Sequence, residues 1–220
     1  MDESWEHAAA PWAEHVRGGG DAPYEWNAPA FFELVPPPGR LTIDVGCGEG
    51  RVARELRARG HRVLGVDPSP TLVDLARAAD PDGDYRVGSA EALPAGDAAA
   101  DLVVSMNVLQ HVAHLQQACD EAARVLESGG AFVMCVVHPI STAGSFADDD
   151  TFVLHDYCKT FERQFPIGEA TVVHHHRPIA AYVDALNHAG LVVEMLREIP
   201  ARRRAEGRIP LYLHVRGVKR

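Results

Sequence analysis

Residues 41–50 read LTIDVGCGEG, in which a short aliphatic run changes into three alternating glycines. The first half of this segment, residues 41–45, has the apolar character of a strand buried in a parallel sheet. Residues 52–56, which follow the glycines, place apolar side chains on one face of a helix. A strand that passes through glycines into a helix allows the backbone to lie close to a ligand at the helix N-terminus.

A second apolar strand is expected at residues 62–66, and it ends in Asp67. An acid at the tip of the second strand can accept hydrogen bonds from both hydroxyls of a ribose. Together with the glycines, Asp67 predicts a cofactor that contains a nucleoside.

Two classes of nucleoside cofactor compete for this segment. The dinucleotide fingerprint G-x-G-x-x-G/A requires glycine or alanine at position 51, where this sequence has Arg51. The pattern that is present, D-x-G-x-G-x-G from Asp44 to Gly50, resembles motif I of the class I S-adenosylmethionine-dependent methyltransferases. An NAD(P)-dependent oxidoreductase is therefore the weaker alternative. A protein that binds the cofactor without transferring its methyl group also stays open, because motif I reports binding rather than turnover.

The resemblance extends over residues 41–137 and points to the small-molecule branch of the family, of which the ubiquinone and menaquinone methyltransferases are distant members. Further segments resemble the successive motifs of that branch: residues 88–94, 101–104, 107–112 and 123–130. The resemblance implies an α/β fold with a Rossmann-like, doubly wound, mostly parallel sheet of about seven strands, the last of them antiparallel.

The order of apolar and amphipathic segments agrees with this fold. Besides the two strands above, strands are expected at residues 85–87, 102–106, 131–137, 191–199 and 209–218, with helices at residues 114–127 and 178–189. Another helix follows Asp67, and either Ser69 or Thr71 can cap its N-terminus.

Two segments outside this core divide the chain into a cap and a main domain. Residues 1–40 are rich in aromatic side chains and form an N-terminal helical cap, either as a patch on the sheet or as a lid that excludes water from the reaction. Residues 41–220 are expected to form the cofactor-binding methyltransferase domain, with an insertion at residues 138–177 after the fifth strand. The insertion is expected to cover the acceptor pocket.

Composition limits the partners of the protein. A length of 220 residues suits one domain, and the net charge of −10 argues against a nucleic-acid partner. No apolar run approaches the ~20 residues of a membrane helix, and the acidic start lacks a secretion signal, so we expect a cytoplasmic protein without membrane contact. The four cysteines have no zinc-binding spacing, and the adjacent histidines of residues 174–176 point to opposite faces of an extended segment, so no metal is expected.

The resemblance implies S-adenosylmethionine as cofactor and S-adenosylhomocysteine as its product. The residues that match the cofactor positions of the family are Asp44, Gly46, Cys47, Gly48, Asp67, Pro68, Leu72, Ser89, Ala90, Glu91, Met106 and Asn107. At position 89 the family usually has an acid, and a neutral serine there implies a weaker contact with the adenine.

The methyl acceptor is expected to be a small molecule with a reactive oxygen or nitrogen. Transfer to such an atom needs a free lone pair, and a histidine that titrates near neutral pH can remove the proton that blocks it. His111 and His138 are the candidates for this acid–base role, although buried structural histidines are the equal alternative. The residues expected around the acceptor are Trp12, Tyr24, Trp26, Tyr157 and His176. The sequence sets no oligomeric state.

Overall fold

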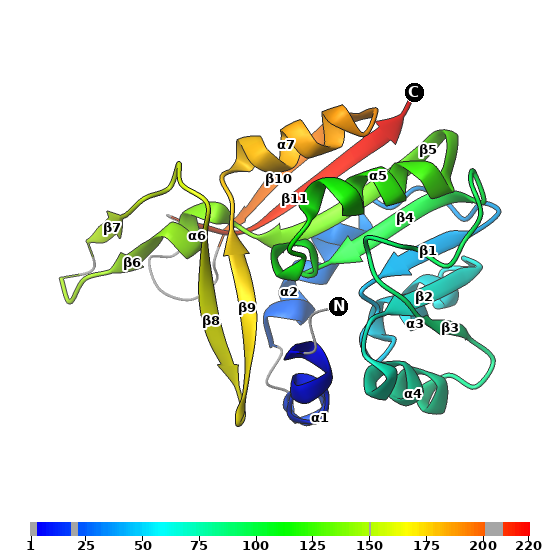
Figure 1. Ribbon diagram of the computed structural model, residues 1–220, viewed down its shortest axis with the longest axis horizontal. Helices are drawn as coiled ribbons and strands as arrows, with labels where there is room; N and C mark the ends of the chain where they lie inside the picture. Colours follow the sequence, from blue (N-terminus) through cyan, green and yellow to red (C-terminus); the bar gives the residue numbers. More distant parts are fainter. Residues whose placement is uncertain (1–3, 19–21, 150, 201–208) are drawn as a thin grey trace.

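A seven-stranded sheet runs through the centre of the computed structural model (Figure 1). The structure describes residues 4–18, 22–149, 151–200 and 209–220, without the side chains of residues 22, 23 and 26. The order of the strands is β10-β11-β5-β4-β1-β2-β3. Their bounds are β1 Thr42–Val45, β2 Val63–Asp67, β3 Asp84–Val87, β4 Ala100–Met106, β5 Leu126–Val137, β10 Leu191–Pro200 and β11 Pro210–Lys219. β11 is antiparallel to both of its neighbours, and the other adjacent pairs are parallel. The predicted fold class is confirmed.

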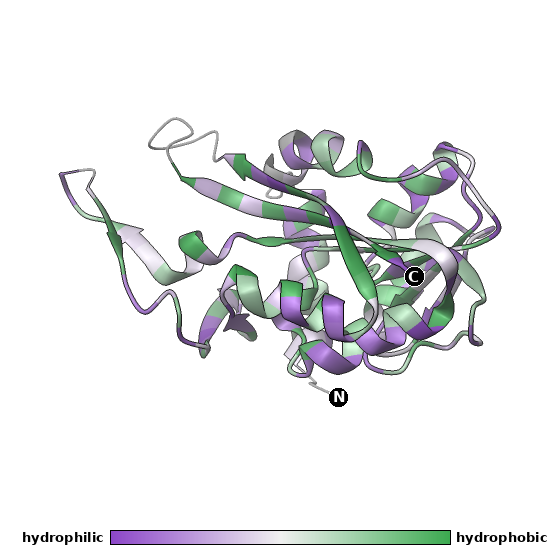
Figure 2. Cartoon of the chain, turned by 90° about the horizontal axis from the view of Figure 1, so that it is seen from above, coloured by the Kyte–Doolittle hydropathy of each residue, from purple (hydrophilic) through white to green (hydrophobic). Residues whose placement is uncertain are grey.

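Helices cover both faces of the sheet because the strands are apolar on both sides. On β5, Phe132 and Met134 belong to one core, with α5 (Leu115–Val125) and α7 (Ile179–His188). The alternate residues, Val133 and Cys135, belong to a second core on the other face. The helices of that second core are α2 (Ala22–Phe32), α3 (Arg51–Ala58) and α4 (Pro70–Ala79). Figure 2 shows hydrophilic and hydrophobic residues alternating along the helices, as one-sided burial requires.

The start of α4 resolves the choice between the two predicted caps. The hydroxyl of Ser69 accepts a hydrogen bond from the backbone N–H of Leu72 at 3.2 Å, so Ser69 is the cap. The hydroxyl of Thr71 instead donates to Glu6 at 2.6 Å, and Glu6 belongs to the N-terminal helix α1 (Ser4–Arg17). The carboxyl end of β2 is thereby tied to the N-terminal segment of the chain.

The insertion after β5 is more regular than its sequence suggests. It begins with the short helix α6 (Pro139–Ala143) and continues into two hairpins. The first pairs β6 (Gly144–Phe146) with β7 (Phe152–Leu154), and the second pairs β8 (Phe161–Ile167) with β9 (Ala170–His176). Figure 1 shows the first hairpin projecting away from the sheet, while the second lies beside α1. Among the helices that the structure describes, none is long and apolar enough to span a bilayer.

Candidate cofactor and acceptor site

A cavity of about 840 Å³ lies at the carboxyl ends of β1, β2 and β4, where ligands bind in doubly wound sheets. Most of the residues predicted from the sequence line it: Trp12, Tyr24, Gly46, Cys47, Gly48, Asp67, Pro68, Leu72, Ser89, Ala90, Glu91, Met106, Asn107 and His111. Asp44 is buried beneath this wall, at 1% exposure, on the strand that leads into the glycines.

The glycine loop presents its backbone to the cavity. Gly46 has a φ of 72°, and a Cβ atom at this position would clash with the side chain of Val108. Gly48 has a φ of 55°, and a Cβ atom built on it would meet nothing within 4 Å. The first glycine therefore permits the tight turn, and the second leaves space beside the backbone for a ligand.

Asp67 joins the glycine loop to the start of α4. Its Oδ2 accepts from the backbone N–H of Gly48, and its Oδ1 accepts from that of Ser69, both at 2.9 Å. The side chain is 5% exposed, and burial raises its pKa to about 6 although these hydrogen bonds favour the ionised form. Each carboxylate oxygen has a second lone pair, so Asp67 can still accept hydrogen bonds from a ligand.

Two buried oxygens behind the loop have no hydrogen-bond partner among the described residues: Oδ2 of Asp44 and the hydroxyl of Tyr24. Burial, and then the charge of Asp67, raises the pKa of Asp44 to about 7. The guanidinium of Arg51 lies 3.7 Å from the centre of the Tyr24 ring. A buried carboxylate oxygen without a partner is costly, and a cationic ligand would lower this cost.

We expect Asp44 to make the stability of the ligand-free protein fall as the pH rises from about 4 to about 7. Folded Asp44 keeps its proton up to about pH 7, whereas an unfolded aspartate loses it near pH 3.9, so the folded state binds more protons in this window. Thermal melts between pH 4 and 8 should give a smaller decrease for Asp44→Asn, whose side chain stays neutral. Parallel profiles for parent and variant would contradict the raised pKa.

The other half of the cavity is formed by α1, the hairpin β8–β9 and the short helix η1 (Leu109–His111). Nδ1 of His111 lies 2.7 Å from the carbonyl oxygen of Val173, which can only accept, so Nδ1 carries the proton. The buried Arg177 holds η1 and the turn after it, because its guanidinium donates to the carbonyls of Leu109, Val112 and Ala113 at 2.6–3.2 Å. The tautomer and the position of His111 are thus set by backbone contacts.

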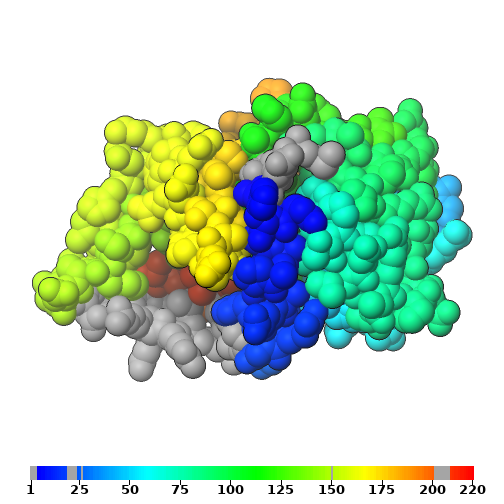
Figure 3. All heavy atoms as spheres, turned by 60° about the horizontal axis from the view of Figure 1, so that its bottom comes forward, coloured from blue at the N-terminus to red at the C-terminus, as the bar shows by residue number. Residues whose placement is uncertain are grey.

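Helix α1 closes the cavity from the outside. The ring of Trp5 stands edge-on to His111, with 5.0 Å between the ring centres, and Trp12 lies 5.9 Å from Trp5. At the other side of the helix, the carboxylate of Glu6 accepts from the hydroxyls of Ser69 and Thr71. Figure 3 shows α1, in dark blue, filling the groove between the yellow hairpin β8–β9 and the cyan segment that contains α4.

Three of the predicted residues do not line this cavity, contrary to expectation: His138, Tyr157 and His176. His138 follows β5, where its Nδ1 caps α6 by accepting from the N–H of Ile140 and its Nε2 lies 2.9 Å from Glu198. His176 stacks on Phe161 and donates from Nε2 to the carbonyl of Tyr157 at 3.0 Å. Hydrogen bonds therefore hold the two histidine rings outside the cavity. The side chain of Trp26 lies outside the described part of the chain.

The lining residues that the sequence analysis missed include four from the half formed by α1 and the hairpin β8–β9, the outer half of the cavity: Trp5, Arg163, Phe165 and His174. Trp5 was only part of an aromatic segment, and His174 only part of a histidine run. One signal was available for the hairpin, because Arg163 and Phe165 are two residues apart, as are Val172 and His174. Residues at this spacing share one face of a strand.

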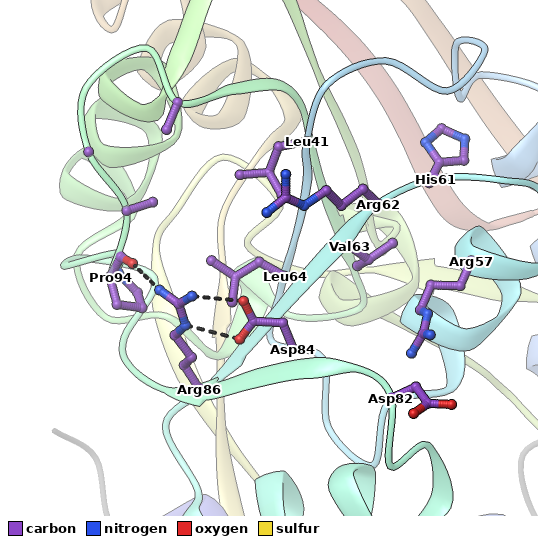
Figure 4. Close-up of a pocket in the computed structure, with 13 residues that line it drawn as sticks. Leu41, Arg57, His61, Arg62, Val63, Leu64, Asp82, Asp84, Arg86 and Pro94 are labelled. Atoms are coloured by element: carbon purple, nitrogen blue, oxygen red, sulfur yellow. Dashed lines mark hydrogen bonds and ion pairs between the residues drawn. The ribbon is translucent and has the colours of Figure 1, made fainter.

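A second cavity of about 580 Å³ lies at the opposite edge of the sheet, where β1, β2 and β3 begin (Figure 4). Two of its charged side chains, Arg86 and Asp84, pair with each other. Arg86 binds both carboxylate oxygens of Asp84, at 2.7 and 3.0 Å, and the carbonyl of Pro94. The glycine loop and Asp67 are absent from its lining, so we assign no part of the cofactor site to it.

Comparison with known proteins agrees with the geometry. Residues 43–134 match the sequence model of a family described as a methyltransferase domain. The chain is 37% identical over 120 residues to a ubiquinone biosynthesis O-methyltransferase of Methylobacterium sp. strain 4-46, across 52% of this chain and 47% of the relative. It is 38% identical over 96 residues to a malonyl-acyl-carrier-protein O-methyltransferase of Serratia marcescens, across 44% of this chain and 38% of the relative. The chain thus spans less than half the length of these curated relatives.

A solved structure matches more of the chain. An S-adenosylmethionine-dependent methyltransferase from Mesorhizobium loti has a TM-score of 0.78 and 28% identity, and the match covers 87% of this chain and 96% of that one. The chain contains a class I methyltransferase domain. S-adenosylmethionine is the cofactor of such domains, as the glycine motif implied.

The residues of this methyltransferase domain fit S-adenosylmethionine. The methionine end of the cofactor carries an ammonium and a sulfonium, and the buried Oδ2 of Asp44 lacks a hydrogen-bond partner among the described residues. Gly48 leaves open space beside the loop, and Asp67 keeps lone pairs at the cavity wall. Both the charge and the shape of this half suit a cationic nucleoside.

Proposed function

We propose that this protein transfers the methyl group of S-adenosylmethionine to an oxygen or nitrogen atom of a small molecule. The observation that carries this proposal is one cavity with two unlike halves. The first half has the glycine loop and Asp67, with Asp44 buried beneath them, and the second has aromatic and imidazole side chains. A methyltransferase needs this arrangement, because the donor and the acceptor must meet in one enclosed space.

Within the first half, we assign each predicted residue a part of the cofactor. Asp67 accepts hydrogen bonds from the ribose hydroxyls, and the backbone of Gly46, Cys47 and Gly48 lies against the methionine and ribose. Asp44 faces the ammonium through the loop, and Met106 and Asn107 border the methionine. The adenine lies among the remaining residues of the set: Pro68, Leu72, Ser89, Ala90 and Glu91. When bound, the cofactor supplies an electrophilic methyl group on sulfur.

His111 is the residue that we assign to proton removal from the acceptor. Its Nδ1–H donates to the carbonyl of Val173, so Nε2 carries the lone pair of the neutral ring. His111 lines the cavity between the cofactor half and the acceptor half. A neutral imidazole held in one tautomer at this place can take the acceptor's proton as the methyl group is transferred.

We further propose that residues 1–40 act as a cap and that α1 is its lid. Two of its tryptophans, Trp5 and Trp12, line the cavity, and Glu6 holds the helix against the start of α4. Closure on this side restricts the acceptor to a small molecule, because a polymer would have to displace α1. Exclusion of water also strengthens the electrostatic contacts inside.

We expect S-adenosylhomocysteine to raise the melting temperature of the protein, and NAD and NADP to leave it unchanged. A ligand at 100 times its dissociation constant stabilises the folded state by about 2.7 kcal/mol, which thermal-shift scans detect readily. Transfer of labelled methyl groups to a small-molecule extract then separates an enzyme from a protein that only binds the cofactor. A thermal shift with a nicotinamide cofactor alone would refute the proposal and favour the oxidoreductase.

A further inference from the structure

The contacts of the His174 side chain do not show a structural role for its imidazole nitrogens. The side chain is only 5% exposed, lines the cavity, and makes no hydrogen bond to any described residue. Its contacts are with rings: His111 at 5.5 Å and Phe165 at 5.4 Å between ring centres. The protein does not fully enclose its ring nitrogens, so they reach the cavity, where a ligand can supply the hydrogen bonds that the protein does not.

The chemistry of His174 defines what it can bind. Burial, and then the nearby histidines and Arg177, lowers the pKa of His174 to about 3, so its ring is neutral at pH 7. A neutral imidazole has one N–H donor and one nitrogen acceptor. It therefore suits a hydroxyl or amide group of a ligand rather than an isolated charge.

Arg163 lies directly opposite His174 in the antiparallel ladder of β8 and β9, and it also lines the cavity. Its guanidinium lies 5.6 Å from the centre of the Phe161 ring and has no carboxylate partner among the described residues. Side chains that face each other across a ladder have Cβ atoms about 4.5–5.5 Å apart. The two side chains can therefore hold neighbouring substituents of one molecule.

The rest of this half sets the shape and charge of that molecule. Trp5, Trp12 and Phe165 provide aromatic walls that suit a planar ring. The carboxylates that line the cavity are Glu49, Asp67 and Glu91, and all of them come from the cofactor half. Among the described residues that line the outer half, none offers a negative charge to a cationic acceptor, whereas Arg163 offers a positive charge to an anionic one.

We propose that His174 and Arg163 bind the methyl acceptor, and that the acceptor is a planar aromatic molecule with an anionic group, such as a carboxylate, next to a hydrogen-bonding group. The anionic group pairs with the guanidinium of Arg163, where a charge-assisted, bidentate contact is available. The neighbouring hydroxyl or amide bonds to the imidazole of His174. This inference rests on the proposed function, since it treats the outer half as the acceptor pocket.

Four probes with a common ring system test the inference by calorimetry, with the protein saturated with S-adenosylhomocysteine. They are 3-hydroxy-2-naphthoate, 2-naphthoate, 2-naphthamide and 2-naphthylmethylamine. We expect 3-hydroxy-2-naphthoate to bind most tightly, and at least tenfold more tightly than the cationic amine. Arg163→Gln should lower the affinity for both carboxylates about tenfold and keep the affinity for the amide within threefold of the parent. His174→Phe keeps a ring but removes both nitrogens. It should lower the affinity for 3-hydroxy-2-naphthoate about tenfold and that for 2-naphthoate less than threefold.

The control is Arg62→Gln, which removes an arginine from the lining of the second cavity and should change none of these affinities.

Binding of the amine as tightly as the carboxylates, or no binding of either carboxylate, would overturn the inference. If His174→Phe lowered the affinity for both carboxylates by the same factor, the proposed role of His174 would be wrong. The affinity for S-adenosylhomocysteine is measured separately for each variant and should stay within twofold of the parent. If the parent fails to bind S-adenosylhomocysteine, the proposed function fails, and the same probe criteria are then applied to the ligand-free protein.

Discussion

The Asp67→Ala variant is expected to bind S-adenosylhomocysteine about a hundredfold more weakly than the parent while keeping its fold. Charge-assisted hydrogen bonds to the two ribose hydroxyls would be lost, each worth about 1.5–3 kcal/mol, and a loss of about 3 kcal/mol is about a hundredfold in affinity. The same carboxylate accepts from the backbone of Gly48 and Ser69, so the loop would also lose part of its anchor. Calorimetry gives the affinity directly.

Two further variants separate charge from local structure. Asp67→Asn keeps one acceptor oxygen for the backbone and should bind with intermediate affinity. Asp74→Ala removes a carboxylate from the exposed side of α4, where it pairs with Arg77, and should leave the affinity unchanged. Circular dichroism melts establish that each variant is folded. An affinity of Asp67→Ala within twofold of the parent would mean that another residue binds the ribose.

Removal of residues 1–18 is expected to abolish methyl transfer while leaving the sheet and its helices folded. Neither hydrophobic core includes a residue of α1, so the sheet keeps its packing. The cavity, however, would lose Trp5, Trp12 and Val16 from its wall and open to water. The cut must fall before α2, because Asn27 bonds to His214 at 2.8 Å and to the thiol of Cys135 in the interior.

Two measurements check the role of the lid. Transfer of labelled methyl groups should fall at least a hundredfold, which corresponds to about 2.7 kcal/mol of transition-state stabilisation. Stopped-flow release of S-adenosylhomocysteine should become at least tenfold faster. Glu6→Gln, which weakens the contact with Ser69 and Thr71, should lower methyl transfer and speed release of S-adenosylhomocysteine by smaller factors. Full activity in the truncated protein would instead make α1 a patch on the sheet.

The cofactor half of the cavity was predictable because its residues are close in sequence to the strands that place them. Asp44 and Asp67 lie at the carboxyl ends of neighbouring parallel strands, and the glycines follow the first of these strands directly. In a doubly wound sheet, such strand ends meet at one edge, so the position of a residue in the motif fixes its position in space. The seven-stranded sheet followed from the same alternation of strands and helices.

The fold, the cofactor class and the residues along one wall of the cavity therefore followed from local patterns in the sequence. The opposite wall depends on tertiary packing, because α1 and β9 are separated by more than 150 residues of chain and yet pack together. Tertiary packing turned His138 toward Glu198 and His176 toward Tyr157, and it left His174 facing the cavity. The direction of a buried ring depends on which hydrogen-bond partners packing brings to it, and these partners come from distant segments. No local pattern encodes that choice.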